Sequence, residues 1–123
     1  MNEKLIHEIV KESVRTPLTT LVRSLKLIPE QGVTDVSLKN LKKIQDSNFE
    51  IGKVVFYFDK HPRLHTEWVN KDDDILVWDF RGFNAGYGGE GPHGLLKALK
   101  MLDIKDWDIE KIKSLEPGKY KLL

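Results

Sequence analysis

Apolar residues recur at helical spacing through the first third of the chain. They form one face over residues 5–14, with charged residues between them, which predicts an amphipathic helix. A second apolar face follows the Thr16–Pro17 pair, in which a capping hydroxyl precedes a proline at the first helical position, and it continues to Leu25. After a break at residues 29–32, Ser37 is expected to cap a third helix. The amino-terminal part is therefore predicted to be helical.

Beyond residue 50 the pattern changes to that of β-strands. Residues 52–58 are β-branched and aromatic, residues 64–69 alternate, and residues 75–80 form a nearly continuous apolar run. The connections are short, and the second of them is a polar turn at 70–74. The three strands are therefore predicted to form an antiparallel meander.

A glycine-rich segment then leads into the last helical part of the chain. A helix from about Pro92 to Leu102 carries a leucine stripe, and Asp106 can cap a short final helix before a turn and an edge strand. The fold class is predicted to be α+β, with amino-terminal helices packed with a small, mostly antiparallel sheet and a glycine loop leading into a carboxy-terminal helix pair. We expect one domain over residues 1–123, with a helical part at 1–47 and a strand-rich body at 48–123.

Composition and charge narrow the class of protein. A chain of 123 residues can bury a core, and 40% hydrophobic with 32% charged residues is ordinary for a soluble domain. The net charge of +1 gives no bulk attraction to nucleic acid or to an anionic membrane. Without cysteine, disulfides and thiolate chemistry are excluded, and no apolar run reaches the roughly 20 residues of a membrane span. We expect a cytoplasmic protein without a membrane partner, and nucleic acid is not the favoured ligand.

The segment RGFNAGYGGEGPHG, residues 81–94, is the main functional clue. Amide groups in the first turn of a helix have no partner within the helix, and glycines in front of them let a phosphate approach the backbone. Arg81 can add a two-pronged contact to a phosphate, and Tyr87 or Phe83 offers a ring to a base. Glu90 can accept a hydrogen bond from a ribose hydroxyl or a base amine. The predicted ligand-binding residues are Arg81, Asn84, Tyr87, Gly88, Gly89, Glu90, Gly91 and His93.

A purely structural interpretation of the same segment stays open. A strand-to-helix connection that needs positive φ angles and a tight helix start would also be rich in glycine, and Gly91 before Pro92 fits such a start. The segment is not a P-loop, because the Lys-Ser/Thr ending is absent, and it does not match the glycine spacing of a dinucleotide fingerprint.

The stretch GYGGEGP running into HGLLKAL resembles a GYGG-x-GP-xx-L segment of small uncharacterised proteins from bacteria and their phages. The resemblance covers residues 80–102. It implies a shared strand–loop–helix unit and a bacterial or phage setting, and it implies no established activity.

Candidate catalytic and metal-binding groups are scattered. Residues 12–21, ESVRTPLTTL, are similar to the phosphoacceptor helix of sensor histidine kinases, but Glu12 stands where those proteins have the phosphorylated histidine. Pro62 argues against a helix that would pair His61 with His65, so no metal site is predicted. His93, Asp79 and Glu90 could converge at the glycine loop, and Asp79 is either a paired buried acid or the residue that orients His93. No catalytic residue and no cofactor are assigned.

The preferred hypothesis is a small, non-enzymatic binding protein for a phosphate-bearing nucleotide or nucleotide signal, which it would sense or sequester in bacterial or phage defence. The first alternative is a protein-interaction module, such as an immunity protein or a small phage inhibitor, in which the amino-terminal helices make the contact and the glycine loop is structural. The second alternative is a small nucleotide hydrolase that uses His93. Homodimer formation and a protein partner stay open.

Overall fold

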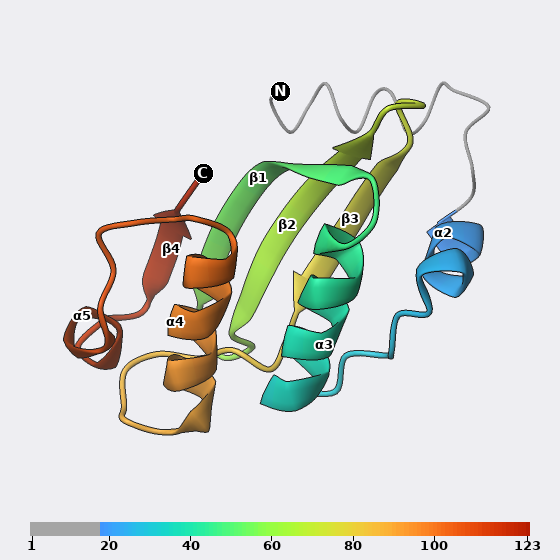
Figure 1. Ribbon diagram of the computed structural model, residues 1–123. Helices are drawn as coiled ribbons and strands as arrows, with labels where there is room; N and C mark the ends of the chain where they lie inside the picture. Colours follow the sequence, from blue (N-terminus) through green and yellow to red (C-terminus); the bar gives the residue numbers. More distant parts are fainter. Residues whose placement is uncertain (1–17) are drawn as a thin grey trace.

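The computed structural model describes residues 18–123, with side chains from residue 22 onward, and this part of the chain has the α+β class that the sequence predicts (Figure 1). The helix expected over residues 5–14 and the Thr16–Pro17 start lie outside the described residues. The elements in chain order are α2 (Leu18–Leu25), α3 (Thr34–Gln45), β1 (Phe49–Phe58), β2 (Arg63–Asn70), β3 (Ile75–Phe80), α4 (Glu90–Met101), α5 (Ile109–Lys113) and β4 (Gly118–Lys121).

The four strands form one antiparallel sheet in the order β3-β2-β1-β4. Strands β1, β2 and β3 are consecutive neighbours, so the predicted meander is confirmed. The carboxy-terminal strand pairs with β1 at the other edge, with Phe56 opposite Tyr120. Phe56 also lies opposite Leu64, which in turn lies opposite Phe80, so these large apolar side chains share one face of the sheet.

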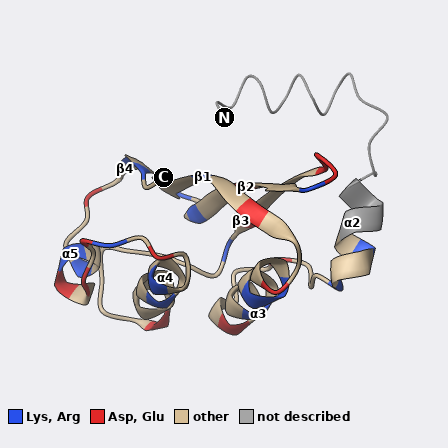
Figure 2. Cartoon of the chain, turned by 45° about the horizontal axis from the view of Figure 1, so that its top comes forward, with Lys and Arg blue, Asp and Glu red and all other residues tan. Residues whose placement is uncertain are grey.

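Helices α3 and α4 lie side by side on that apolar face, and α5 lies beside α4 (Figures 1 and 2). Their buried side chains meet those of the strands in one core, as expected when a helix stripe and a sheet face are both removed from water. The largest side chains buried in this core are Trp68, Phe56, Phe80, Phe83, Leu41, Ile44, Leu64, Leu76, Leu95, Leu99 and Ile112. No described helix covers the opposite face of the sheet (Figure 2).

The helix starts differ from those that the sequence predicts. Helix α3 begins at Thr34, so Ser37 lies one turn inside the helix and does not cap it. The short helix α5 is capped by Asp108, whose side chain accepts a hydrogen bond from the Lys111 amide, and not by Asp106. Pro92 occupies the third position of α4, where its missing N–H is still one of those without a partner inside the helix.

Within residues 18–123, no helix is both long enough and apolar enough to span a membrane.

Candidate functional site

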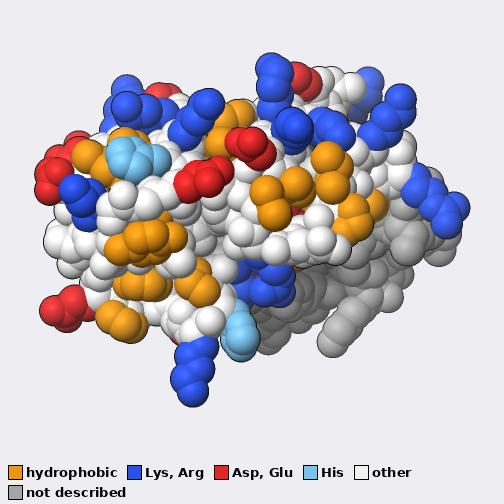
Figure 3. Space-filling view, turned by 90° about the horizontal axis from the view of Figure 1, so that it is seen from below, with side chains coloured by type: hydrophobic (Ala, Val, Ile, Leu, Met, Phe, Trp, Pro, Cys, Tyr) orange, Lys and Arg blue, Asp and Glu red, His pale blue; other side chains and the backbone are white. Residues whose placement is uncertain are grey.

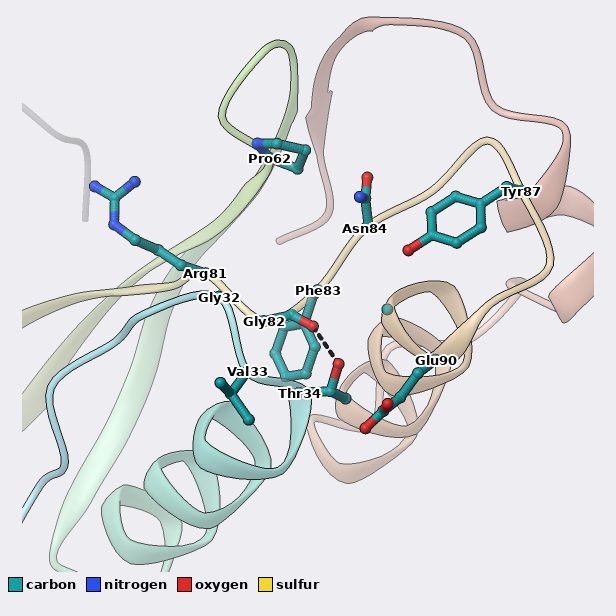
Figure 4. A pocket seen from close by; sticks show the side chains of 11 residues that line it. Gly32, Val33, Thr34, Pro62, Arg81, Gly82, Phe83, Asn84, Tyr87 and Glu90 are labelled. Carbon is teal, nitrogen blue, oxygen red and sulfur yellow. Dashed lines mark hydrogen bonds between the residues drawn. The ribbon is translucent and has the colours of Figure 1, made fainter.

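A hollow of about 360 Å³ lies where α3 and α4 begin (Figure 4). Both helices start at the same end of the molecule, and the segment that follows β3 passes between them and the β1–β2 turn (Figures 1 and 4). The hollow is lined by Gly32, Val33, Thr34, Pro62, Arg81, Gly82, Phe83, Asn84, Tyr87, Glu90 and Gly91. Its volume falls within the range of about 300 to 1,000 Å³ that is typical of small-molecule pockets.

Five of the eight predicted ligand-binding residues line this hollow. They are Arg81, Asn84, Tyr87, Glu90 and Gly91. Gly88, Gly89 and His93 do not line it, and His93 is exposed on the first turn of α4. Tyr87 is 49% exposed, whereas Phe83 is 1% exposed and packs against Phe80, so Tyr87 is the ring of the two that a planar ligand can reach.

The start of the glycine segment is fastened to α3 by hydrogen bonds. The Thr34 hydroxyl donates to the Gly82 carbonyl oxygen at 2.7 Å, and the Gly82 amide donates to the Ser37 hydroxyl at 2.9 Å. Thr34 and Ser37 are both buried on α3. This explains why Ser37 is not a cap: its hydroxyl is used inside the core to hold a segment that lies 45 residues further along the chain.

Glu30 anchors the same region, although its sequence context does not mark it as a site residue. Its carboxylate accepts hydrogen bonds from the Ser37 hydroxyl at 2.5 Å, the Asn40 amide group at 2.6 Å, the Trp78 indole at 3.1 Å and the Arg81 backbone amide at 3.0 Å. One carboxylate thus joins α3, β3 and the first residue of the glycine segment. The sequence indicates this network only weakly, through two polar residues, Ser37 and Asn40, on the face of α3 that also carries Leu41 and Ile44.

The geometry gives packing reasons for several of the glycines. A Cβ on Gly82 would collide with the backbone carbonyl of Val33, and Gly86 has a φ of +83°, a region that favours glycine. Steric room is also too small for a Cβ at Gly89, Gly91 and Gly94. The glycine content alone therefore does not require a ligand, and the features that indicate a binding site are the hollow and its charges.

Charge is distributed unevenly around the hollow. Neither Val33 before α3 nor Gly89 before α4 gives its helix a side-chain cap, so partial positive charge from two helix starts faces this region. Glu90 lies in the first turn of α4, and its carboxylate points toward Thr34 (Figure 4). The Arg81 side chain is exposed at the opposite end of the hollow, and its guanidinium points away from Glu90 and Asn84 (Figure 4). The site therefore has an acidic end at Glu90 and a basic end at Arg81.

Asp79 does not meet His93. It points to the face of the sheet opposite α3 and α4, where its carboxylate lies 2.7 Å from His65 Nδ1. His65 Nε2 lies 3.0 Å from Glu67 Oε1, and Glu67 is fully buried. Both ring nitrogens of His65 are thus occupied by carboxylates, so this histidine has no free nitrogen with which to act as a base. Of the two alternatives for Asp79, the paired acid is therefore the one observed, although the side chain is partly exposed, and the expectation that Asp79 orients His93 is wrong.

The His65 cluster makes stability depend on pH. The hydrogen bond with Asp79 raises the pKa of His65 above its ordinary value of 6.5, burial opposes this shift, and the hydrogen bond with Glu67 adds to it. Because the folded-state pKa is raised, the stabilisation is fully present below the unfolded-state value and is lost as pH rises through the folded-state value. We expect the free energy of unfolding of the wild type to fall more steeply than that of His65→Gln as the pH rises above 6.5, the ordinary pKa of histidine. Urea unfolding at a series of pH values measures this, and equal slopes would contradict it.

Comparisons with known proteins found no match: no family model, no curated protein and no solved structure is similar to this chain. The fold and the hollow therefore define an α+β protein with a charge-polarised pocket, and its function is argued from that pocket.

Proposed function

We propose that this protein binds a small phosphate-bearing nucleotide, or a nucleotide signal, in the hollow at the starts of α3 and α4. The observation that carries the proposal is the meeting of an exposed arginine, a carboxylate and an exposed aromatic ring around one pocket at the starts of two helices. Each of these is common alone, but together they provide the contacts that a phosphate, a sugar and a base require.

The polarity of the hollow favours one orientation of the ligand. A phosphate is attracted to Arg81 and repelled by the carboxylate of Glu90, so the phosphate belongs at the Arg81 end. The nucleoside then lies toward Glu90 and Asn84, which can accept hydrogen bonds from ribose hydroxyls or base amines. The Tyr87 ring stands beside them and can stack on the base (Figure 4).

Binding is proposed as the function itself, without catalysis. His93 is exposed outside the hollow, and Asp79 is engaged with His65 on the other face of the sheet. In a bacterial or phage cytoplasm, such a protein would act by sensing or sequestering a nucleotide signal. The interaction-module alternative is favoured if no nucleotide binds.

Thermal unfolding in the presence of a nucleotide panel tests the proposal. The panel includes mononucleotides, cyclic dinucleotides and trinucleotides, NAD and ADP-ribose with its cyclic isomers. A ligand at about 100 times its dissociation constant stabilises the folded state by about 2.7 kcal/mol, which raises the unfolding temperature of a domain of this size by several degrees. No shift with any member of the panel would contradict the proposal.

Arg81→Ala is expected to weaken the binding of any nucleotide found in this way by about tenfold or more, because it removes the cation at the phosphate end. Lys105→Ala is the control, because it removes one exposed cation far from the site. Lys105 lies beyond the carboxyl end of α4, and this helix, about 18 Å long, separates Lys105 from the hollow. Calorimetric titration should give unchanged affinity for this control. Equal affinity of Arg81→Ala and the wild type would refute the assignment of the phosphate end.

A further inference from the structure

A second hollow opens beside the first, and the two share Arg81. It has a volume of about 580 Å³ and is lined by Asp59, Lys60, His61, Arg63 and Arg81. All but Arg81 come from the β1–β2 turn or the first residue of β2. Pro62 of the same turn lines the first hollow, so one short turn borders both (Figure 4). Figure 3 looks at this end of the molecule, where basic side chains and a histidine lie close together.

The turn that forms the second hollow is held in place by its own contacts. Asp59 accepts a hydrogen bond from the His61 backbone amide at 2.8 Å, and its carboxylate lies 3.1 Å from the Arg63 guanidinium. The same guanidinium lies over the Tyr57 ring, 4.4 Å from its centroid. The His61 amide, followed by the hydrogen bond from Arg63, lowers the pKa of Asp59, so this carboxylate stays charged and keeps Arg63 in position. A preorganised cation loses less conformational entropy when an anion binds.

The second hollow carries an excess of positive charge that its own acid does not balance. Lys60, Arg63 and Arg81 contribute three cations against the single carboxylate of Asp59. Lys60 and His61 are exposed, and no hydrogen bond or ion pair ties either side chain to another of the described residues 18–123. Glu90, the acid of the first hollow, does not line the second. This hollow is therefore suited to a ligand that carries more negative charge than a single phosphate bound at Arg81.

We infer that the ligand is a nucleoside polyphosphate, whose nucleoside lies in the first hollow and whose phosphate chain passes Arg81 into the second hollow along residues 59–63. The inference rests on the proposed function and specifies its ligand class. Arg81 borders both hollows and would contact the phosphate nearest the sugar, while Lys60, His61 and Arg63 would contact the outer phosphates.

Calorimetric titrations without magnesium test the inference. The probes are inorganic phosphate, inorganic tripolyphosphate, and the common ribonucleoside monophosphates and triphosphates. We expect tripolyphosphate to bind more tightly than phosphate, and at least one triphosphate to bind about tenfold more tightly than its monophosphate. In Lys60→Ala/His61→Ala this preference should fall to about twofold, with little change in monophosphate affinity. Both replaced side chains are exposed, so the variant should fold. Lys105→Ala, which also removes one lysine charge, should keep the full preference.

The possible failures are distinguishable. If monophosphates bind with dependence on Arg81 but triphosphates bind no more tightly, or if Lys60→Ala/His61→Ala keeps the preference, the inference is wrong and the proposed function stands. If no nucleotide of any kind binds, the proposed function fails, and the inference fails with it. A single-stranded oligonucleotide that binds more tightly than every triphosphate would also overturn the inference, because the second hollow would then belong to a nucleic-acid backbone.

Discussion

Replacing Glu30 with alanine is expected to lower the free energy of unfolding by about 3 kcal/mol, because one substitution removes the acceptor of four hydrogen bonds. Two of the donors, on Ser37 and Asn40, belong to fully buried residues. A buried donor that loses its acceptor costs about 1 to 3 kcal/mol, and the effects of neighbouring losses are not additive. Urea unfolding gives the change directly.

The effect of Glu30→Ala should extend to the binding site. The Arg81 amide would lose its anchor on Glu30, and Gly82 is fastened to Ser37, which is itself a partner of Glu30. Glu30→Gln keeps one carbonyl acceptor and should lie between the wild type and Glu30→Ala in stability. The matched control is Glu50→Ala, which removes an exposed carboxylate from β1 and should change stability by less than about 0.5 kcal/mol. Equal stability of Glu30→Ala and Glu50→Ala would mean that the network contributes nothing.

The second large effect is expected at Gly82. Its missing side chain leaves room for the Val33 backbone carbonyl, which an added Cβ would overlap, and for the Ser37 hydroxyl oxygen, which would lie 2.7 Å from that Cβ. Backbone atoms cannot move aside as a flexible side chain can, so Gly82→Ala must displace α3 or the glycine segment. We expect a loss of about 3 kcal/mol in the free energy of unfolding, together with loss of nucleotide binding.

Gly88→Ala separates this effect from a general requirement for glycine. A Cβ at Gly88 would meet only the end of the Lys113 side chain, at 3.1 Å, and that side chain can move. The expected loss of stability is less than about 1 kcal/mol, and nucleotide affinity should be retained because Gly88 does not line the hollow. If Gly82→Ala and Gly88→Ala unfold at the same urea concentration, the Val33 carbonyl does not exclude a side chain at position 82, and this prediction is wrong.

The strands and the last long helix could be predicted because their patterns are local. Residues 52–58, 64–69 and 75–80 all lie within observed strands, and the leucine stripe of α4 is buried. The predicted cap at Ser37 was wrong because this residue has partners outside its own helix. Ser37 resembles a cap because a serine precedes an apolar run, but its hydroxyl bonds to Glu30 and Gly82 across the core. No local pattern encodes such a pairing.

About half of the first hollow could be predicted from the sequence, because only part of its lining is local in sequence. The residues that are contiguous in sequence, from Arg81 to Gly91, were found from their composition. The wall formed by residues 32–34 comes from the start of α3, whose position beside the glycine segment depends on tertiary packing. The β1–β2 turn was also missed, because Lys60 and Arg63 look like ordinary surface charges until the fold brings Arg81 beside them.

The most direct test of the central claim is the mapping of amide chemical shifts by NMR during titration with the nucleotide that gives the largest thermal shift. Nucleotide binding in the first hollow should cause saturable changes at two separate stretches, residues 32–34 and residues 81–91, since residues of both stretches line this hollow. Amides of β2 near Glu67, whose side chain lies on the far face of the sheet, should stay constant. Changes confined to other surfaces, or no saturable changes at all, would contradict a nucleotide site at the starts of α3 and α4.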